Sequence, residues 1–114
     1  MIDIIKHVED TLTPLNLLVS FQKLPDGITI PSQYITFLEI IANPDLEAGD
    51  VELETKRLIQ INIWSKSNYH SLVEQVKKLM EEADYERTFE HDMPYNDGDS
   101  HFNKVLRFVF FDEY

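Results

Sequence analysis

Residues 57–89 read RLIQINIWSKSNYHSLVEQVKKLMEEADYERTF, and this stretch decides the fold. In its first part, Ile59, Ile61 and Ile63 alternate with polar or aromatic side chains, which is the period-two pattern of a half-buried strand. Its second part repeats apolar residues at intervals of three and four, which predicts an amphipathic helix. The apolar stripe of this helix comprises Leu72, Val73, Val76, Leu79, Met80 and Ala83.

Two starts of this helix fit the sequence. Ser67 or Asn68 can cap it, because short polar side chains accept hydrogen bonds from the first free backbone N–H groups. Ser71 and Glu74 also have the spacing of a capping box, in which the two residues cap each other's backbone. Both starts stay open at this point.

The remaining elements follow from the same periodicities and from the turn residues. We expect a helix over about residues 2–11, ended by Pro14, and a turn at Pro25–Gly27. The acidic segment 42–54 is expected to begin as a loop and to become the start of a long strand. The predicted strands span about residues 17–22, 33–41, 51–65, 85–91 and 103–111.

The predicted element order is α-β-β-β-α-β-β. This order predicts an α+β fold with a single domain over residues 1–114, in which two helices pack on one face of a mainly antiparallel sheet of four to five strands. In the last strand, apolar side chains occupy both faces, which predicts a central strand or one whose second face meets a partner. The two sets are Leu106, Phe108 and Phe110 on one face, and Val105, Val109 and Phe111 on the other.

Composition and charge narrow the class of function. The chain has 114 residues and no cysteine, so disulfides, thiolate metal sites and cysteine catalysis are excluded for this sequence. Its net charge is −11, with 10 basic against 21 acidic residues, which disfavours nucleic-acid and anionic-membrane binding. The first residues do not form a signal peptide, and no stretch approaches the roughly 18 apolar residues of a membrane span. We therefore expect a soluble, cytoplasmic protein.

Motifs for catalysis or cofactor binding are weak. No serine lies in a nucleophile-elbow context, and Gly27, Gly49 and Gly98 are too isolated to form a phosphate-binding loop. One loop gathers possible ligands for a divalent cation, although its acidic residues also suit a solvated turn. These residues are His91, Asp92, Asp97, Asp99 and His101. We expect no catalytic residue, no cofactor and no metal.

Two features are candidates for contact with a partner. Trp64 lies on the polar face of its strand, where it either packs under a loop or the start of the second helix, or anchors a partner. The acidic run within residues 45–54 is either a solvated loop or a loop that meets a charged partner. With the second face of the last strand, the candidate interface comprises Trp64, Asp45, Glu47, Asp50, Glu52, Val109 and Phe111.

A family resemblance extends over about Ile35–Phe111. The segment YITF, the strand ending INIWSKS, the helix SLVEQVKKLMEEA, the strand YERTFEHD and the final VLRFVFF together resemble the tail-terminator, or tail-completion, proteins of long-tailed bacteriophages. The family is typified by the lambda tail terminator. The resemblance implies two helices against a mainly antiparallel sheet, and a ring, commonly hexameric, that caps the finished tail tube and presents it to the head.

The resemblance also implies the binding partners of the chain and its location. The partners would be other copies of the chain, the tail tube protein and a head-completion protein, in the host cytoplasm during assembly and then in the virion tail. DNA would later pass through the ring without specific binding, and no membrane is involved.

Other functions also fit the sequence. The charge suits an acidic inhibitor that mimics DNA and binds a nucleic-acid-binding protein. Other small phage neck or connector proteins share this size and composition. A third hypothesis is a small hydrolase that uses the loop from His91 to His101.

Overall fold

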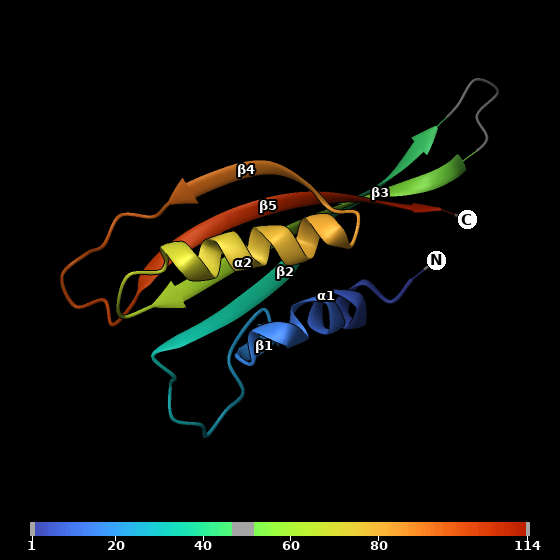
Figure 1. The fold of residues 1–114 in the computed structure, drawn as a ribbon. Helices are drawn as coiled ribbons and strands as arrows, with labels where there is room; N and C mark the ends of the chain where they lie inside the picture. Colours follow the sequence, from blue (N-terminus) through green and yellow to red (C-terminus); the bar gives the residue numbers. More distant parts are fainter. Residues whose placement is uncertain (1, 47–51, 114) are drawn as a thin grey trace.

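The structure is a computed structural model that describes residues 2–46 and 52–113. Figure 1 shows two helices lying on the same side of a twisted sheet. The elements are α1 (Ile4–Leu12), a 3-10 turn η1 (Thr13–Leu15), β1 (Leu18–Phe21), β2 (Gln33–Leu46), β3 (Glu52–Ser65), α2 (His70–Glu82), β4 (Glu86–Asp92) and β5 (Phe102–Glu113).

The five strands form one sheet in the order β1-β2-β3-β5-β4. β2, β3, β5 and β4 pair antiparallel with their neighbours, whereas β1 runs parallel to β2. The predicted α+β class, the number of strands and the packing of both helices on one face are confirmed. β5 pairs with β3 on one side and β4 on the other, so the first of the two predicted alternatives for the last strand, a central strand, is confirmed.

The core lies between the helices and the sheet. Ile59, Ile61 and Ile63 are at most 1% exposed and point toward the helices, as their alternation predicts. Fully burying one such side chain stabilises the fold by roughly 1.5–3 kcal/mol. The buried cluster comprises Ile4, Val8, Leu12, Ile35, Phe37, Ile59, Ile61, Ile63, Leu72, Val73, Val76, Met80, Tyr85, Leu106 and Phe108.

A short polar side chain accepts a backbone hydrogen bond at the start of each helix. Asp3 caps α1, because its Oδ1 accepts a hydrogen bond from the backbone N–H of Lys6 at 3.2 Å. The N-cap of α2 is Tyr69, one residue after the predicted cap, and Asn68 Oδ1 accepts from the N–H of His70 at 2.9 Å, so the helix starts nearer to Asn68 than to the predicted Ser71–Glu74 capping box. The predicted end of α1 is slightly early, since the helix continues to Leu12 and Pro14 lies in the 3-10 turn that follows.

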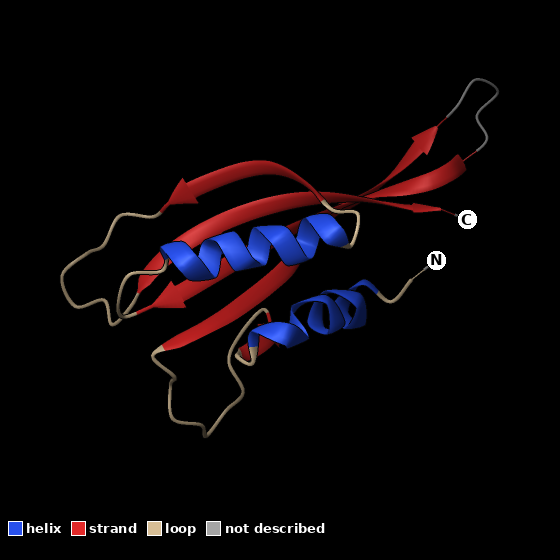
Figure 2. Ribbon diagram, viewed as in Figure 1, coloured by secondary structure: helices blue, strands red, loops and turns tan. Residues whose placement is uncertain are grey.

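The prediction that residues 42–46 form a loop is wrong. β2 continues to Leu46 and pairs antiparallel with β3, so that the two strands form a long hairpin (Figure 2). Pro44 is tolerated there because β1 pairs only with β2 residues up to Phe37, which leaves the rest of β2 as an edge strand. The hairpin projects past both helices and gives the molecule extents of 53 × 26 × 24 Å.

Candidate interaction surface

The side of the sheet turned away from the helices is called the open face here. Within residues 2–46 and 52–113, no helix packs against it. The register aligns its side chains in rows across the strands, for example Thr36, Asn62 and Val105. Its side chains are Tyr34, Thr36, Leu38 and Ile41 from β2, Lys56, Leu58, Gln60, Asn62 and Trp64 from β3, Asn103, Val105, Arg107, Val109 and Phe111 from β5, and Phe89 and His91 from β4.

A bulge in β2 changes which side chains reach the open face. Glu39 pairs with Ile59 on the helix side, whereas Ile41 pairs with Leu58 on the open face, so that Ile40 is the extra residue. Ile40 and Ile41 are 40% and 45% exposed. The bulge therefore places an exposed isoleucine beside Leu58.

One end of the open face forms an apolar groove. Ile41, Leu58, Val109 and Phe111 make up this apolar end. A groove of about 340 Å³ runs between Ile41, Leu58 and Val109, and Lys56 and Thr88 complete its lining. Val109 is only 6% exposed and forms the floor, whereas Phe111 is 38% exposed beside it. Apolar side chains exposed together in this way are typical of interaction sites.

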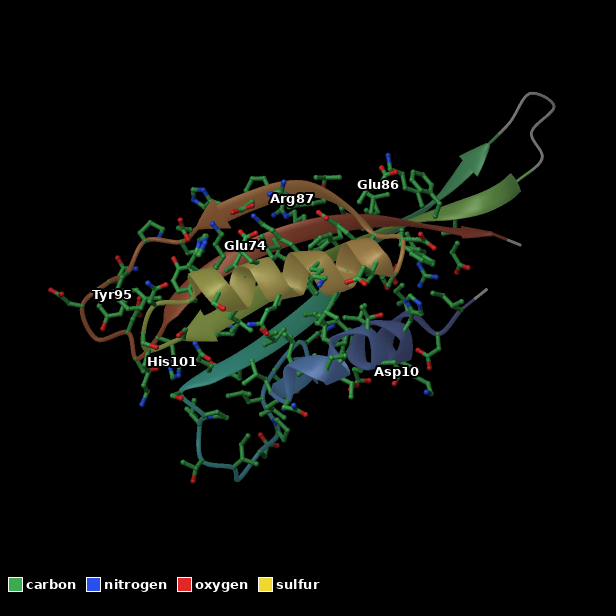
Figure 3. All side chains as sticks on the ribbon, viewed as in Figure 1. Asp10, Glu74, Glu86, Arg87, Tyr95 and His101 are labelled. Atoms are coloured by element: carbon green, nitrogen blue, oxygen red, sulfur yellow. The ribbon has the colours of Figure 1, made fainter. Side chains whose placement is uncertain are left out.

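Charge divides the two sides of the sheet. Among the residues whose side chains the structure describes, the charged ones on the open face are Lys56, Arg107 and, at the edge opposite Val109, Glu86. The Cζ atom of Arg107 lies 4.8 Å from the ring centroid of Phe89, a cation–π arrangement. The solvent sides of α1 and α2 carry exposed carboxylates, of which Asp10 and Glu74 are labelled in Figure 3. Most described acidic side chains therefore lie away from the open face.

The structure places the predicted interface residues at two ends of this face. Val109 and Phe111 lie at the apolar end, and Asp45 and Glu52 lie on the adjoining β2–β3 hairpin. Glu47 and Asp50 fall outside the described residues. Sequence reasoning missed Ile41, Leu58 and Phe89, because only the bulge and the strand order bring them together. The signal in the sequence that could have indicated an exposed apolar site is the pair of adjacent isoleucines at the end of a predicted strand.

Trp64 lies at the opposite end of the open face. It is six positions from Leu58 along β3, roughly 20 Å at about 3.3 Å per residue. Its indole Nε1–H donates a hydrogen bond to Thr36 Oγ1 at 2.9 Å. Its ring stacks on Tyr34, with the centroids 5.9 Å apart. Trp64 is half-buried, so it both packs on the sheet and keeps a surface for contact.

A polar cluster on the helix side joins β4 to its neighbours. Glu90 forms ion pairs with Lys77 of α2 at 2.7 Å, with Lys104 of β5 at 3.0 Å and with Arg87. The hydrogen bond from Lys77, followed by those from Lys104 and Arg87, lowers the pKa of Glu90 to about 2. A carboxylate held ionised in this way is a poor general acid or base near neutral pH, so the cluster is a structural cross-link.

The loop between β4 and β5 does not gather its acidic and histidine side chains around one point. His101 Nε2 contacts the carbonyl oxygen of Pro31 at 2.8 Å and its Nδ1 contacts Ser100 Oγ at 2.7 Å. Asp92 accepts a hydrogen bond from Tyr69. In the part of the chain that the structure describes, no three His, Asp or Glu side chains are placed to hold a metal ion. Figure 3 shows Tyr95 out on this loop and His101 at the end of the sheet.

No helix among the described residues is both long enough and apolar enough to cross a membrane.

Comparison with known proteins assigns neither a family nor a function to the chain. The chain matches no protein-family model and no curated protein sequence.

Proposed function

We propose that this chain is a structural protein of phage or prophage morphogenesis, a tail terminator that caps the completed tail tube as a ring and forms the head–tail joining surface. The observation that carries the proposal is the open face, whose apolar end exposes Ile41 and Phe111 beside a hairpin that projects from the body. Burying apolar surface contributes roughly 25 cal/mol per Å², which favours association through this face.

The shape of the apolar end suits a ring. It lies on one side of the sheet only, whereas the opposite side carries the helices. In the proposed ring, a neighbouring copy meets it with a different surface, and repeated contacts between unlike surfaces close into rings when the rotation allows. The tail-terminator resemblance implies the same architecture of helices on a mainly antiparallel sheet.

The charge supports the same role. A net charge of −11 gives a ring little affinity for DNA, which suits the passage of DNA through it. The proposed partners are other copies of the chain, the tail tube protein and a head-completion protein. The protein would act in the host cytoplasm during assembly and then in the virion tail, without catalysis, cofactor or membrane.

The direct test uses tail tubes of the phage that encodes the chain, purified without a terminator. The protein should bind one end of each tube in electron micrographs and stop further growth of the tube. Phe111→Asp should abolish end binding. Phe102→Asp is the matched control, because Phe102 is similarly exposed at 41% on the same strand but on the helix side. Tubes that neither bind the protein nor stop growing would overturn the proposal.

A second candidate is an acidic inhibitor that mimics DNA. The observation in its favour is that each helix carries exposed acidic residues and that both helices lie on the same side of the sheet (Figure 1). Lys77 and Lys78 interrupt the row on α2, which weakens the mimicry of a phosphate backbone. A pulldown from cell lysate that returns no DNA-binding protein would exclude this candidate. Another small neck or connector role would appear in the tail-tube experiment as binding elsewhere than at the tube end.

A further inference from the structure

The loop between β1 and β2, residues 23–32, exposes two isoleucines. Ile28 is 41% exposed and Ile30 is 51% exposed. Single exposed isoleucines are common on protein surfaces, but two at a spacing of two residues on one loop form a small apolar patch. The loop stands at the opposite end of the molecule from the β2–β3 hairpin (Figure 1). Both side chains therefore remain available to another molecule.

Hydrogen bonds hold both ends of this loop on the sheet. Just before its start, the backbone N–H of Gln22 donates to the carbonyl oxygen of Phe37 at 2.8 Å. Near its end, Nε2 of the buried His101 contacts the carbonyl oxygen of Pro31 at 2.8 Å. Between the two anchors, Gly27 adopts a φ of 76°, as a tight turn requires. A loop held in this way loses little conformational freedom when its tip binds a partner.

The anchor at His101 places the loop at the Trp64 end of the open face. His101 lines a pocket of about 310 Å³ beside Trp64, together with residues of β2 and β5. Leu58, in the apolar groove, lies roughly 20 Å from Trp64 along β3, at about 3.3 Å per residue. The loop also extends away from the apolar end (Figure 1). Its two isoleucines can therefore meet an apolar groove only on another copy of the chain.

The loop and the groove at the apolar end are complementary in polarity and in charge. Lys56 lines the groove, is exposed, and forms no ion pair with another described residue. On the loop, Asp26 precedes Ile28 by two residues, and its side chain is 96% exposed. Its ion pair with Lys23 is long, at 3.8 Å, and lies in solvent, so it contributes little. Each surface thus has an apolar centre with one charge beside it, and the two charges are opposite.

We propose that residues 23–32 of one copy dock in the groove at the apolar end of the next copy. Ile28 and Ile30 cover the apolar lining of the groove, and Asp26 lies beside Lys56. The inference rests on the proposed function, because it names the surface that a neighbouring copy presents to the apolar end. Since loop and groove lie at opposite ends of the chain, each copy can use both, and such head-to-tail contacts close into a ring. A loop contact is smaller than the roughly 800 Å² per partner of a standard interface, so one contact alone is weak.

Cross-linking between introduced cysteines tests the contact, because the chain has no cysteine of its own. One copy carries Ile30→Cys, and a second copy with a longer tag carries Ile41→Cys. The two are mixed, treated with a short bismaleimide and analysed by mass, first in solution and then on tail tubes. We expect a cross-linked pair that contains one copy of each kind. Phe102→Cys replaces Ile30→Cys in the control, since Phe102 is also 41% exposed but lies outside the loop, and it should give no mixed pair.

Substitutions test the same contact through the strength of self-association. Ile30→Asp should weaken self-association about tenfold, as Phe111→Asp does on the other side of the contact. Asp26→Lys and Lys56→Asp should each weaken it, because each places like charges together. The chain that carries both substitutions should associate like the unchanged chain, because the attraction is restored with reversed signs. Two losses that simply add in the double substitution would show that the two side chains do not meet.

The outcomes separate this inference from the proposed function. If the chain assembles on tail tubes but Ile30→Cys and Ile41→Cys copies give no mixed pair, the inference is wrong and the proposed function stands. If Ile41→Cys copies cross-link only to each other, the apolar ends meet like with like, which also overturns the inference. A mixed pair without any binding to tail tubes supports the contact and removes the tail role. If the chain neither self-associates nor binds tail tubes, both are wrong.

Discussion

Arg57 Nη1 lies 2.9 Å from Asp112 Oδ2, in a pair whose side chains are only 10% and 3% exposed. Glu39 joins the pair, accepting from Arg57 Nη2 at 3.0 Å, and the backbone N–H of Ile2 donates to Asp112 Oδ2 at 3.2 Å. The network therefore ties β2, β3 and β5 to the start of the chain. The hydrogen bonding that Arg57 donates to the Glu39 carboxylate is the main cause of the raised pKa of Arg57.

Removing Asp112 should strongly destabilise the fold. Asp112→Ala leaves the buried Arg57 without one of its two carboxylates, and we expect the free energy of unfolding to fall by about 3 kcal/mol. Urea denaturation measures the change. Asp10→Ala removes a solvent-exposed ion pair with Lys6 and should change stability little. Equal losses in the two variants would contradict a special role for the buried network.

Stability should fall in acid through Glu90. Its pKa in the folded protein is about 2, below the ordinary value of 4.5, because of Lys77, Lys104 and Arg87. The stability that it contributes is therefore fully present above about pH 4.5 and is lost as the pH falls toward 2. Glu90→Gln should flatten this part of a plot of unfolding free energy against pH, whereas Glu82→Gln should not. If Glu90→Gln loses unfolding free energy below pH 4.5 as steeply as the unchanged chain does, then other groups cause the loss of stability in acid.

The hydrogen bond between Trp64 and Thr36 should appear as coupling between two mutations. Thr36 is 7% exposed, so Trp64→Phe leaves its hydroxyl without the indole donor and should lower the free energy of unfolding by about 2 kcal/mol. Thr36→Val leaves the indole N–H unpaired in turn. The double variant should lose less than the sum of the two, by about 1 kcal/mol. Additive losses in chemical denaturation would exclude the coupling.

Self-association should depend on the apolar end. Phe111→Asp places a charge beside the groove floor at Val109, and we expect it to weaken association about tenfold or more. Phe102→Asp should associate like the unchanged chain. Sedimentation velocity across a concentration series measures both, with thermal unfolding as the check on folding. If both substitutions weaken self-association equally, the added negative charge, and not the apolar end, causes the loss of association.

The fold could largely be predicted from local patterns. The isoleucine alternation in β3 and the apolar stripe of α2 both reflect burial against a single core, so each pattern identifies its element without knowledge of the others. The prediction of a loop at residues 42–46 is wrong because Asn43, Pro44 and Asp45 favour turns, whereas pairing with β3 extends the strand. The parallel pairing of β1 was not predicted either, because it depends on a connection that no periodicity describes.

The candidate surfaces were harder to predict. Val109 and Phe111 were found because apolar residues on both faces of a strand are visible in the sequence. Ile41 joins them only through a bulge, which shifts the side-chain alternation by one position. The pocket beside Trp64 joins residues from three strands and a loop, so no local pattern in the sequence predicts it.

The most direct test of ring assembly is the mass of the chain in solution by light scattering, measured across protein concentration and salt, with and without magnesium, and then with tail tubes added. The account predicts a concentration-dependent species of ring size, or assembly on the tubes, that Phe111→Asp abolishes. A chain that stays monomeric under every condition and remains free of the tubes would contradict it.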